Sequence, residues 1–348
     1  MNEVLQRKCE LFDQNRTAIS KKFKFEKPIM SIAAGLIYTG ADREVDIEKL
    51  TECRDILKRH AGHFSEYRDI VKLALISEMA LSDEPEQYID DVKSVYEKLH
   101  KGKFRDNSYM VLAAMLLCDI GRQNTADEII EKHNEIMCRM NDLHPVLTSS
   151  EDISYAILLA LSDKSVDAML SDMAECYDYL KKECKIKVGS DSVQGLSEIL
   201  ALTDGNMKAK CDRIVSLYNQ LKGHKVDAGG YAFISLGTFV NVDADPEVLV
   251  KEILEADAYL SGLKGFDEKN LQKNYRLMFA IILVSECYGT GMSIANSISV
   301  STVLSVIKVQ KLVTMITVLS NVLPSVLGAV LDKSDAEETD TEAGGEED

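Results

Sequence analysis

The chain has 348 residues, of which 46% are hydrophobic and 28% are charged, and its formal net charge is −17. These proportions are ordinary for a globular protein, so they exclude a wholly disordered chain, a collagen and a multi-span membrane protein. The acidic balance leaves no basic footprint for nucleic acid, which we therefore do not expect as a partner.

Cysteine usage and the N-terminus indicate the compartment. None of the eight cysteines forms a C-x-x-C pair, and most lie on apolar helical stripes. This pattern is typical of buried thiols in a reducing compartment. The first ten residues are charged and helical in pattern, without the apolar stretch of a secretory signal. We expect a cytoplasmic protein, with membrane association as an alternative.

Two sequence marks recur with one period in the body of the chain. The pentapeptides Met79-Ala-Leu-Ser-Asp83, Leu159-Ala-Leu-Ser-Asp163 and Leu200-Ala-Leu-Thr-Asp204 are spaced by 80 and 41 residues. A tyrosine with leucine three positions later follows each of them, at Tyr96, Tyr177 and Tyr218, with spacings of 81 and 41 residues. Both marks give a period of about 40 residues, which is typical of helical repeat proteins.

Each unit predicts two helices joined by a turn. The first helix is apolar nearly all round, as in Met110-Val-Leu-Ala-Ala-Met-Leu-Leu117, and the second is amphipathic, with Val92, Val95, Tyr96 and Leu99 at helical spacing. We therefore predict an all-α fold, an α-solenoid-like array of five to seven helical hairpins followed by C-terminal hydrophobic helices. The predicted parts are a repeat domain (1–289), an uncharged hydrophobic helical segment (290–331) and a disordered acidic tail (332–348).

Three stretches carry a family resemblance. These are Phe104-Arg-Asp-Asn-Ser-Tyr-Met-Val-Leu-Ala-Ala, Leu147 to Asp163, and Tyr275-Arg-Leu-Met-Phe-Ala280. They resemble the bacterial family called domain of unknown function four thousand and three, over roughly residues 5–330. The resemblance implies a helical protein and assigns no catalytic residue.

The predicted segment 290–331 has only two charges, Lys308 and Lys311. Its last 20 residues are long enough to cross a bilayer as a helix, and they carry an apolar stripe. The stripe consists of Leu312, Ile316, Leu319, Leu323, Val326 and Val330. Three interpretations stay open: helices that cap the array or bury themselves in an oligomer, membrane association through residues 291–331, or a β-prone segment that pairs with itself.

No group of residues in the sequence matches a known catalytic, metal-binding or cofactor-binding motif. His60-x-x-His63 has no third ligand at metal-site spacing, and no phosphate-binding glycine loop occurs. We predict no catalytic residue, no metal site and no cofactor. Thr148, Glu151 and Asp152 look like the start of a helix, and they are the stretch to mutate first if a site exists.

Three functions remain as hypotheses. The first is a non-catalytic scaffold that binds a protein partner, or itself, through the face that bears Tyr96, Tyr177 and Tyr218. The second is a protein anchored or docked on a membrane by its C-terminal helices. The third, an enzyme of unrecognised class, has the least support.

Overall fold

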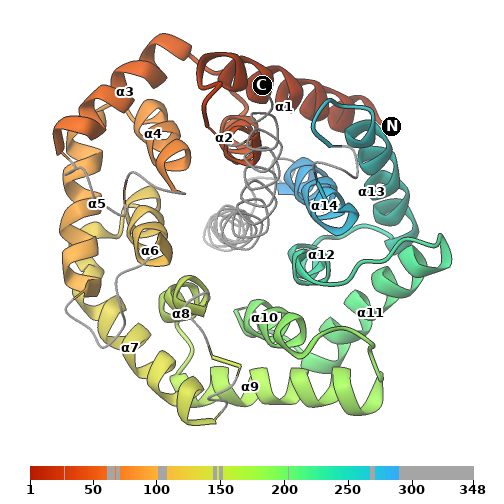
Figure 1. Ribbon diagram of the computed structural model, residues 1–348. Coiled ribbons are helices and arrows are strands. Elements are labelled where there is room, and N and C mark those ends of the chain that lie inside the picture. The colour runs from red at the N-terminus through yellow and green to blue at the C-terminus, as the bar shows by residue number, and fades with distance from the viewer. Residues whose placement is uncertain are drawn as a thin grey trace, which may run out of the picture.

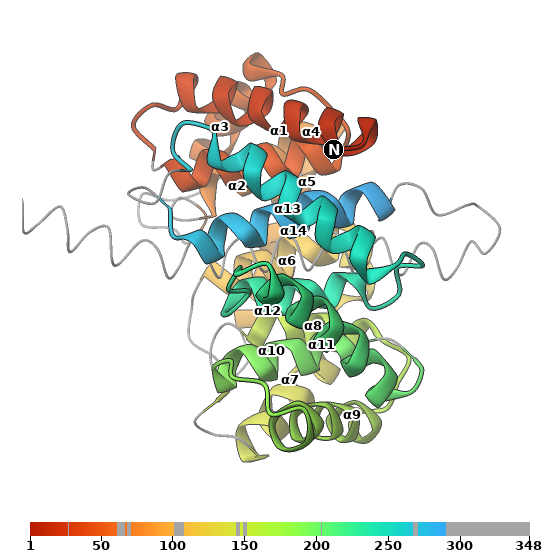
Figure 2. The same ribbon diagram turned by 90° about the vertical axis from the view of Figure 1, so that its right-hand side faces the viewer.

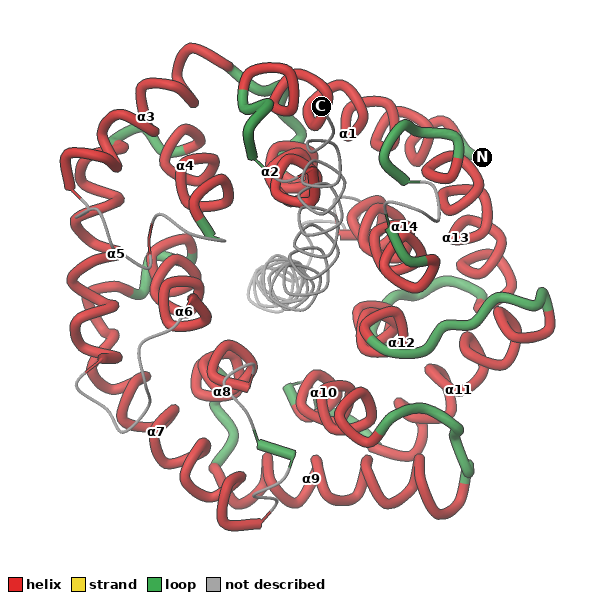
Figure 3. Tube along the Cα trace, viewed as in Figure 1, coloured by secondary structure: helices red, strands yellow, loops and turns green. Residues whose placement is uncertain are grey.

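The computed structural model describes residues 1–26, 28–60, 67, 71–100, 108–143, 147–148, 152–202, 204–266 and 271–289. All regular elements in these ranges are helices, as the sequence predicts (Figure 3). Fourteen α-helices alternate along the described chain between an outer and an inner layer (Figure 1).

The outer layer consists of the odd-numbered helices. They are α1 (Glu3–Lys22), α3 (Ile47–His60), α5 (Pro85–His100), α7 (Ala126–Leu143), α9 (Val166–Asp178), α11 (Met207–Gly223) and α13 (Pro246–Ser261). The even-numbered helices surround a common axis inside them (Figure 1). They are α2 (Pro28–Gly40), α4 (Lys72–Leu81), α6 (Ser108–Asp119), α8 (Asp152–Leu161), α10 (Ser190–Ala201), α12 (Tyr231–Ser235) and α14 (Lys273–Gly289). Two short 3-10 turns, η2 (Gln123–Thr125) and η4 (Leu236–Phe239), and a π-helical turn, η3 (Tyr179–Glu183), extend this framework.

Local sequence explains where the outer helices begin. Asn206 and Ser165 accept hydrogen bonds from backbone N–H groups three residues later, and so cap α11 and α9. Asp245 caps α13 by accepting from the N–H of Glu247, two residues later, and Pro246 stands in the first turn, where no N–H is required. Glu84-Pro85 has the same acid-proline pattern as Asp245-Pro246, and α5 begins at Pro85.

The layer to which each helix belongs follows its hydrophobic pattern. In the outer helix α5, the buried side chains recur at helical spacing and the remaining faces are polar. In the inner helix α2, all eleven residues from Ile29 to Thr39 are buried. Such a run covers every side of a helix at 3.6 residues per turn, so α2 is buried on all its sides.

The array closes on itself, a feature that the sequence analysis does not predict. Helix α1 packs on both α13 and α14, so the first hairpin lies against the last one (Figures 1 and 2). Asn2 caps α1 and also donates a hydrogen bond to Glu252 of α13. The N-terminal ammonium lies 3.0 Å from a carboxylate oxygen of Glu255. We call this contact between α1 and α13–α14 the seam.

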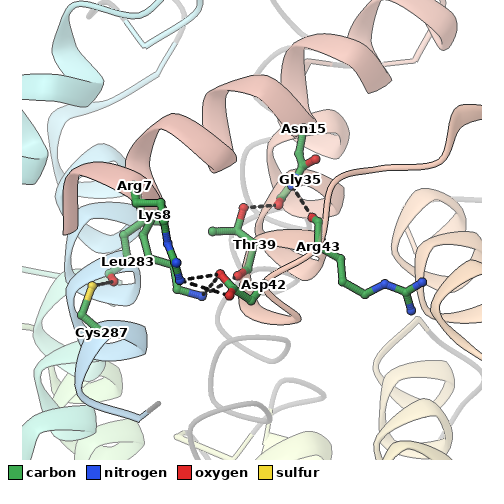
Figure 4. Close-up of polar contacts among 9 residues, drawn as sticks. All are labelled: Arg7, Lys8, Asn15, Gly35, Thr39, Asp42, Arg43, Leu283 and Cys287. Carbon is green, nitrogen blue, oxygen red and sulfur yellow. Dashed lines mark hydrogen bonds and ion pairs between the residues drawn. The ribbon is translucent and has the colours of Figure 1, made fainter. Parts of the chain in front are cut away.

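A buried lysine braces the hairpin next to the seam (Figure 4). Lys8 of α1 is 1% exposed, and its Nζ donates to the backbone carbonyl of Thr39 over 2.9 Å. The same nitrogen lies 3.3 Å from Oδ1 of Asp42, which also pairs with Arg7. A buried cation is tolerated only with such partners, so Lys8 fixes the end of α2 against α1.

Candidate functional site

A small pocket lies where α7, α9 and α10 meet. Its volume is about 30 Å³, enough for an ordered water. The lining is Met140, Leu143, Thr148, Leu170, Met173, Ala174, Tyr177, Gln194 and Ser197. The lining is mostly methionine and leucine, with a few polar side chains that can hydrogen-bond a bound molecule in one orientation. The pocket is too small for most substrates.

Gln194 of α10 is the polar group of this pocket that sequence analysis missed. Its side chain is 5% exposed, and its Nε2 donates a long hydrogen bond of 3.4 Å to the carbonyl of Leu147. Its Oε1 accepts no hydrogen bond from the residues that the structure describes. A buried acceptor of this kind favours a water or another donor in the pocket, since an unsatisfied buried group is costly.

The pocket brings together two residues that the sequence singled out separately. Thr148 and Tyr177 both line it, although they come from different predicted features. Asp152 begins α8, where its carboxylate faces the positive end of the helix dipole, and it is buried. Glu151 lies outside the described residues.

The other two predicted tyrosines lie in the core between the layers. Tyr96 is 8% exposed and meets the ring of Tyr67 edge-on, with centroids 5.1 Å apart. Tyr218 is 6% exposed and packs against Phe233 of α12, with centroids 5.4 Å apart. Tyr218 thus joins the outer helix α11 to the inner layer, and the repeated tyrosine presents little surface at either position.

The sides of the seven inner helices that face the ring axis form a second candidate surface, which we call the inner wall. In α6, ten consecutive residues from Ser108 to Leu117 are buried. The inner helices pack on ring neighbours and on the outer layer, and helices on opposite sides, such as α2 and α10, have no substantial contact among the described residues. The inner wall is therefore apolar, and inner helices from the opposite side do not cover it.

The inner layer also carries buried charge of one sign. In its described helices every buried charged side chain is a carboxylate, and these are Glu78, Asp152, Glu198 and Glu286. Three of them follow a serine within an apolar run, at Ser77, Ser197 and Ser285. This repeated Ser-Glu pair is the sequence pattern from which these three glutamates could have been predicted.

Glu198 shows where such a carboxylate lies. Leu196 of α10 packs on Gly237 of η4, and η4 lies against the outer helix α11. Ile199 of α10 approaches Gly237 even more closely than Leu196 does. Glu198 is 1% exposed and lies between these two packing positions in the sequence of α10.

Buried ionisable groups elsewhere have shifted pKa values. Burial lowers the pKa of His133 on α7 to about 4, so this imidazole is neutral at pH 7. Burial also raises the pKa of the Cys9 thiol to about 12 and that of Cys53 to about 11. These thiols are protonated at neutral pH and are therefore poor nucleophiles.

The predicted C-terminal features lie outside the described residues. This applies to segment 290–331, to its apolar stripe from Leu312 to Val330, and to the acidic tail. Within the described ranges, no helix combines the length and the apolar character needed to cross a membrane.

A family model matches residues 15–312, most of the chain. The chain belongs to the family described as Protein of unknown function (DUF4003). This confirms the resemblance drawn from the sequence and assigns no activity. The match runs past α14 and includes Lys308, Lys311 and Leu312. Comparisons with the curated proteins and with the solved structures found no match.

Proposed function

We propose that this family member is a non-catalytic scaffold, built from repeated helical hairpins, that binds a protein segment on its inner wall. The outer helices begin at residues 3, 47, 85, 126, 166, 207 and 246, so the intervals of 38 to 44 residues agree with the period of the sequence marks. Hairpins of equal length, each contacting its neighbours, are the construction of repeat scaffolds.

One observation carries the proposal: the inner wall is buried although inner helices from opposite sides of the ring do not pack together. On α6, Leu112, Ala113 and Met115 point to different sides of the helix, and each is at most 2% exposed. An apolar surface of this extent favours an apolar occupant over water. A polypeptide segment fits, because it can satisfy its own backbone hydrogen bonds as a helix.

The binding surface in this proposal differs from the one that the sequence favoured. Tyr96 and Tyr218 already pack in the core, so their side chains offer a partner little area. The inner helices instead combine apolar side chains with buried carboxylates, which select against an acidic occupant. We therefore expect a partner segment that is apolar with isolated basic residues.

The proposal is tested by placing a photo-crosslinking amino acid at four consecutive positions of α6 in the full chain: Leu112, Ala113, Ala114 and Met115. Four consecutive residues sample every side of a helix, so at least one faces the ring axis. We expect that position to crosslink a polypeptide outside α4, α5, α7 and α8, the elements around α6. Crosslinks confined to those four helices at all positions would contradict the proposal.

A further inference from the structure

We propose that the occupant of the inner wall is the uncharged C-terminal segment of the same chain, residues 291–331. This inference rests on the proposed function and names the first ligand of that surface. It makes the segment an intramolecular ligand, which a protein partner must displace.

The route of the chain supports this assignment. Helix α14 belongs to the inner layer, so the described part of the chain ends in that layer, at Gly289 (Figure 1). The 41 residues of the segment span about 60 Å as helix, at 1.5 Å per residue. The inner helices have at most 17 residues, so each spans at most about 25 Å. The segment is therefore long enough to run along the inner wall and back.

The chemistry of the segment matches that of the wall. Its apolar stripe, including Leu319 and Leu323, resembles the leucine- and alanine-rich inner helices in character. Its only charges are Lys308 and Lys311. These are of opposite sign to the buried carboxylates of α4, α8, α10 and α14.

Other undescribed parts of the chain suit this role less, because the tail 332–348 is strongly acidic and the rest are too short. Between described helices, the undescribed stretches contain at most seven residues, and the longest, 101–107, holds four charges. The family match also extends through residue 312, so the first half of the segment belongs to the sequence that the family shares. A segment that the family shares, and that directly follows an inner helix, is a reasonable intramolecular ligand for the inner wall.

The test uses the full chain with a photo-crosslinking amino acid at Leu319, irradiated as a mixture of isotope-labelled and unlabelled protein. We expect crosslinks within one molecule, to peptides of the inner helices. A matched variant with the crosslinker at Val248, an exposed position on α13, should give no inner-helix peptide. Crosslinks from Leu319 to a second copy, to lipid or only to outer helices would overturn the proposal.

A charge substitution gives an independent readout. Leu319→Lys places an extra ammonium on the apolar stripe, whereas Thr317→Lys places it on the opposite side of the same helical pattern. We expect Leu319→Lys to raise amide hydrogen exchange in α6 and α10 at least tenfold more than Thr317→Lys does, with helical content retained. Equal exchange in the two variants would contradict the proposal.

The two proposals fail differently. If α6 crosslinks another protein while Leu319 reaches no inner helix, the inner wall is a binding surface and the segment is not its ligand. If α6 crosslinks only its helical neighbours, both proposals are wrong.

Discussion

The ring of Phe12 meets the ring of Phe266 edge-on, with centroids 5.9 Å apart. Phe12 lies on α1, and Phe266 lies in the connection between α13 and α14, more than 250 residues later. Phe266 in turn contacts Phe279 of α14, with centroids 6.2 Å apart. This aromatic chain is the apolar part of the seam that closes the ring.

Phe12→Ala should weaken the seam. The side chain is fully buried, and truncating a buried phenylalanine costs about 3 to 5 kcal/mol of unfolding free energy. Phe25→Ala removes the same side chain from a position that is 93% exposed, so it should change stability by less than about 0.5 kcal/mol. Urea unfolding of both variants measures this, and equal midpoints would show that α1 does not close the ring.

Gly35→Ala should also destabilise the first hairpin. A Cβ at Gly35 would lie 2.9 Å from Cβ and 3.0 Å from the backbone nitrogen of Arg16 on α1. Relieving this overlap would require the backbone of α1 to move, which costs stability. We expect a loss of about 1 to 3 kcal/mol. Gly223→Ala meets no atom within 4 Å and should be neutral or slightly stabilising. A thermal melt in which both variants match the wild type would argue against the close packing of α1 on α2.

His133 predicts a pH dependence of stability. Its pKa is about 4 when folded, because of burial, and about 6.5 when unfolded, so protonation favours the unfolded chain. The contribution of His133 to stability is complete above pH 7 and is lost as the pH falls from about 6.5 to 4, by up to about 3 kcal/mol. His133→Gln should flatten this part of the unfolding free energy curve, whereas His224→Gln, at an exposed position, should not. An unchanged slope in His133→Gln would show that another group causes the acid loss.

Gln194→Met tests the unsatisfied acceptor in the α7–α9–α10 pocket. The substitution keeps the length of the side chain and removes the unpaired Oε1 together with one long hydrogen bond. We expect the unfolding free energy to stay equal or to rise by about 1 kcal/mol. A loss above about 2 kcal/mol would mean that Gln194 binds a partner that holds the pocket together.

The sequence predicts local structure well because hydrophobic periodicity and capping are local. The apolar run from Met110 to Leu117 becomes an inner helix, and the amphipathic stripe around Val92 becomes an outer one. The seam depends on pairs such as Asn2–Glu252 and Arg16–Lys264, about 250 residues apart, and no local pattern encodes such contacts. Closure is therefore a finding of the structure.

The candidate site was less predictable for a related reason. Thr148 and Tyr177 stood out as a helix start and a repeat mark, and their meeting in one pocket follows from how α7, α9 and α10 pack. The repeated tyrosine looked like a surface feature, because a phenol has a polar tip. Its aromatic body packs in the core at Tyr96 and Tyr218. Gln194 has no sequence signal, because a lone polar residue in an apolar helix has no characteristic spacing.

The most direct test of the account is a set of three distances, measured by double electron–electron resonance between spin labels on full-length protein. Labels at Ser94 and Val248 mark the outer helices α5 and α13 on opposite sides of the ring (Figure 1), and a third label replaces Leu319. If the C-terminal segment occupies the inner wall, Leu319 lies closer to each outer label than the two outer labels lie to each other. If Leu319 is farther from either label than the span of the ring, the segment lies outside and the central claim is wrong.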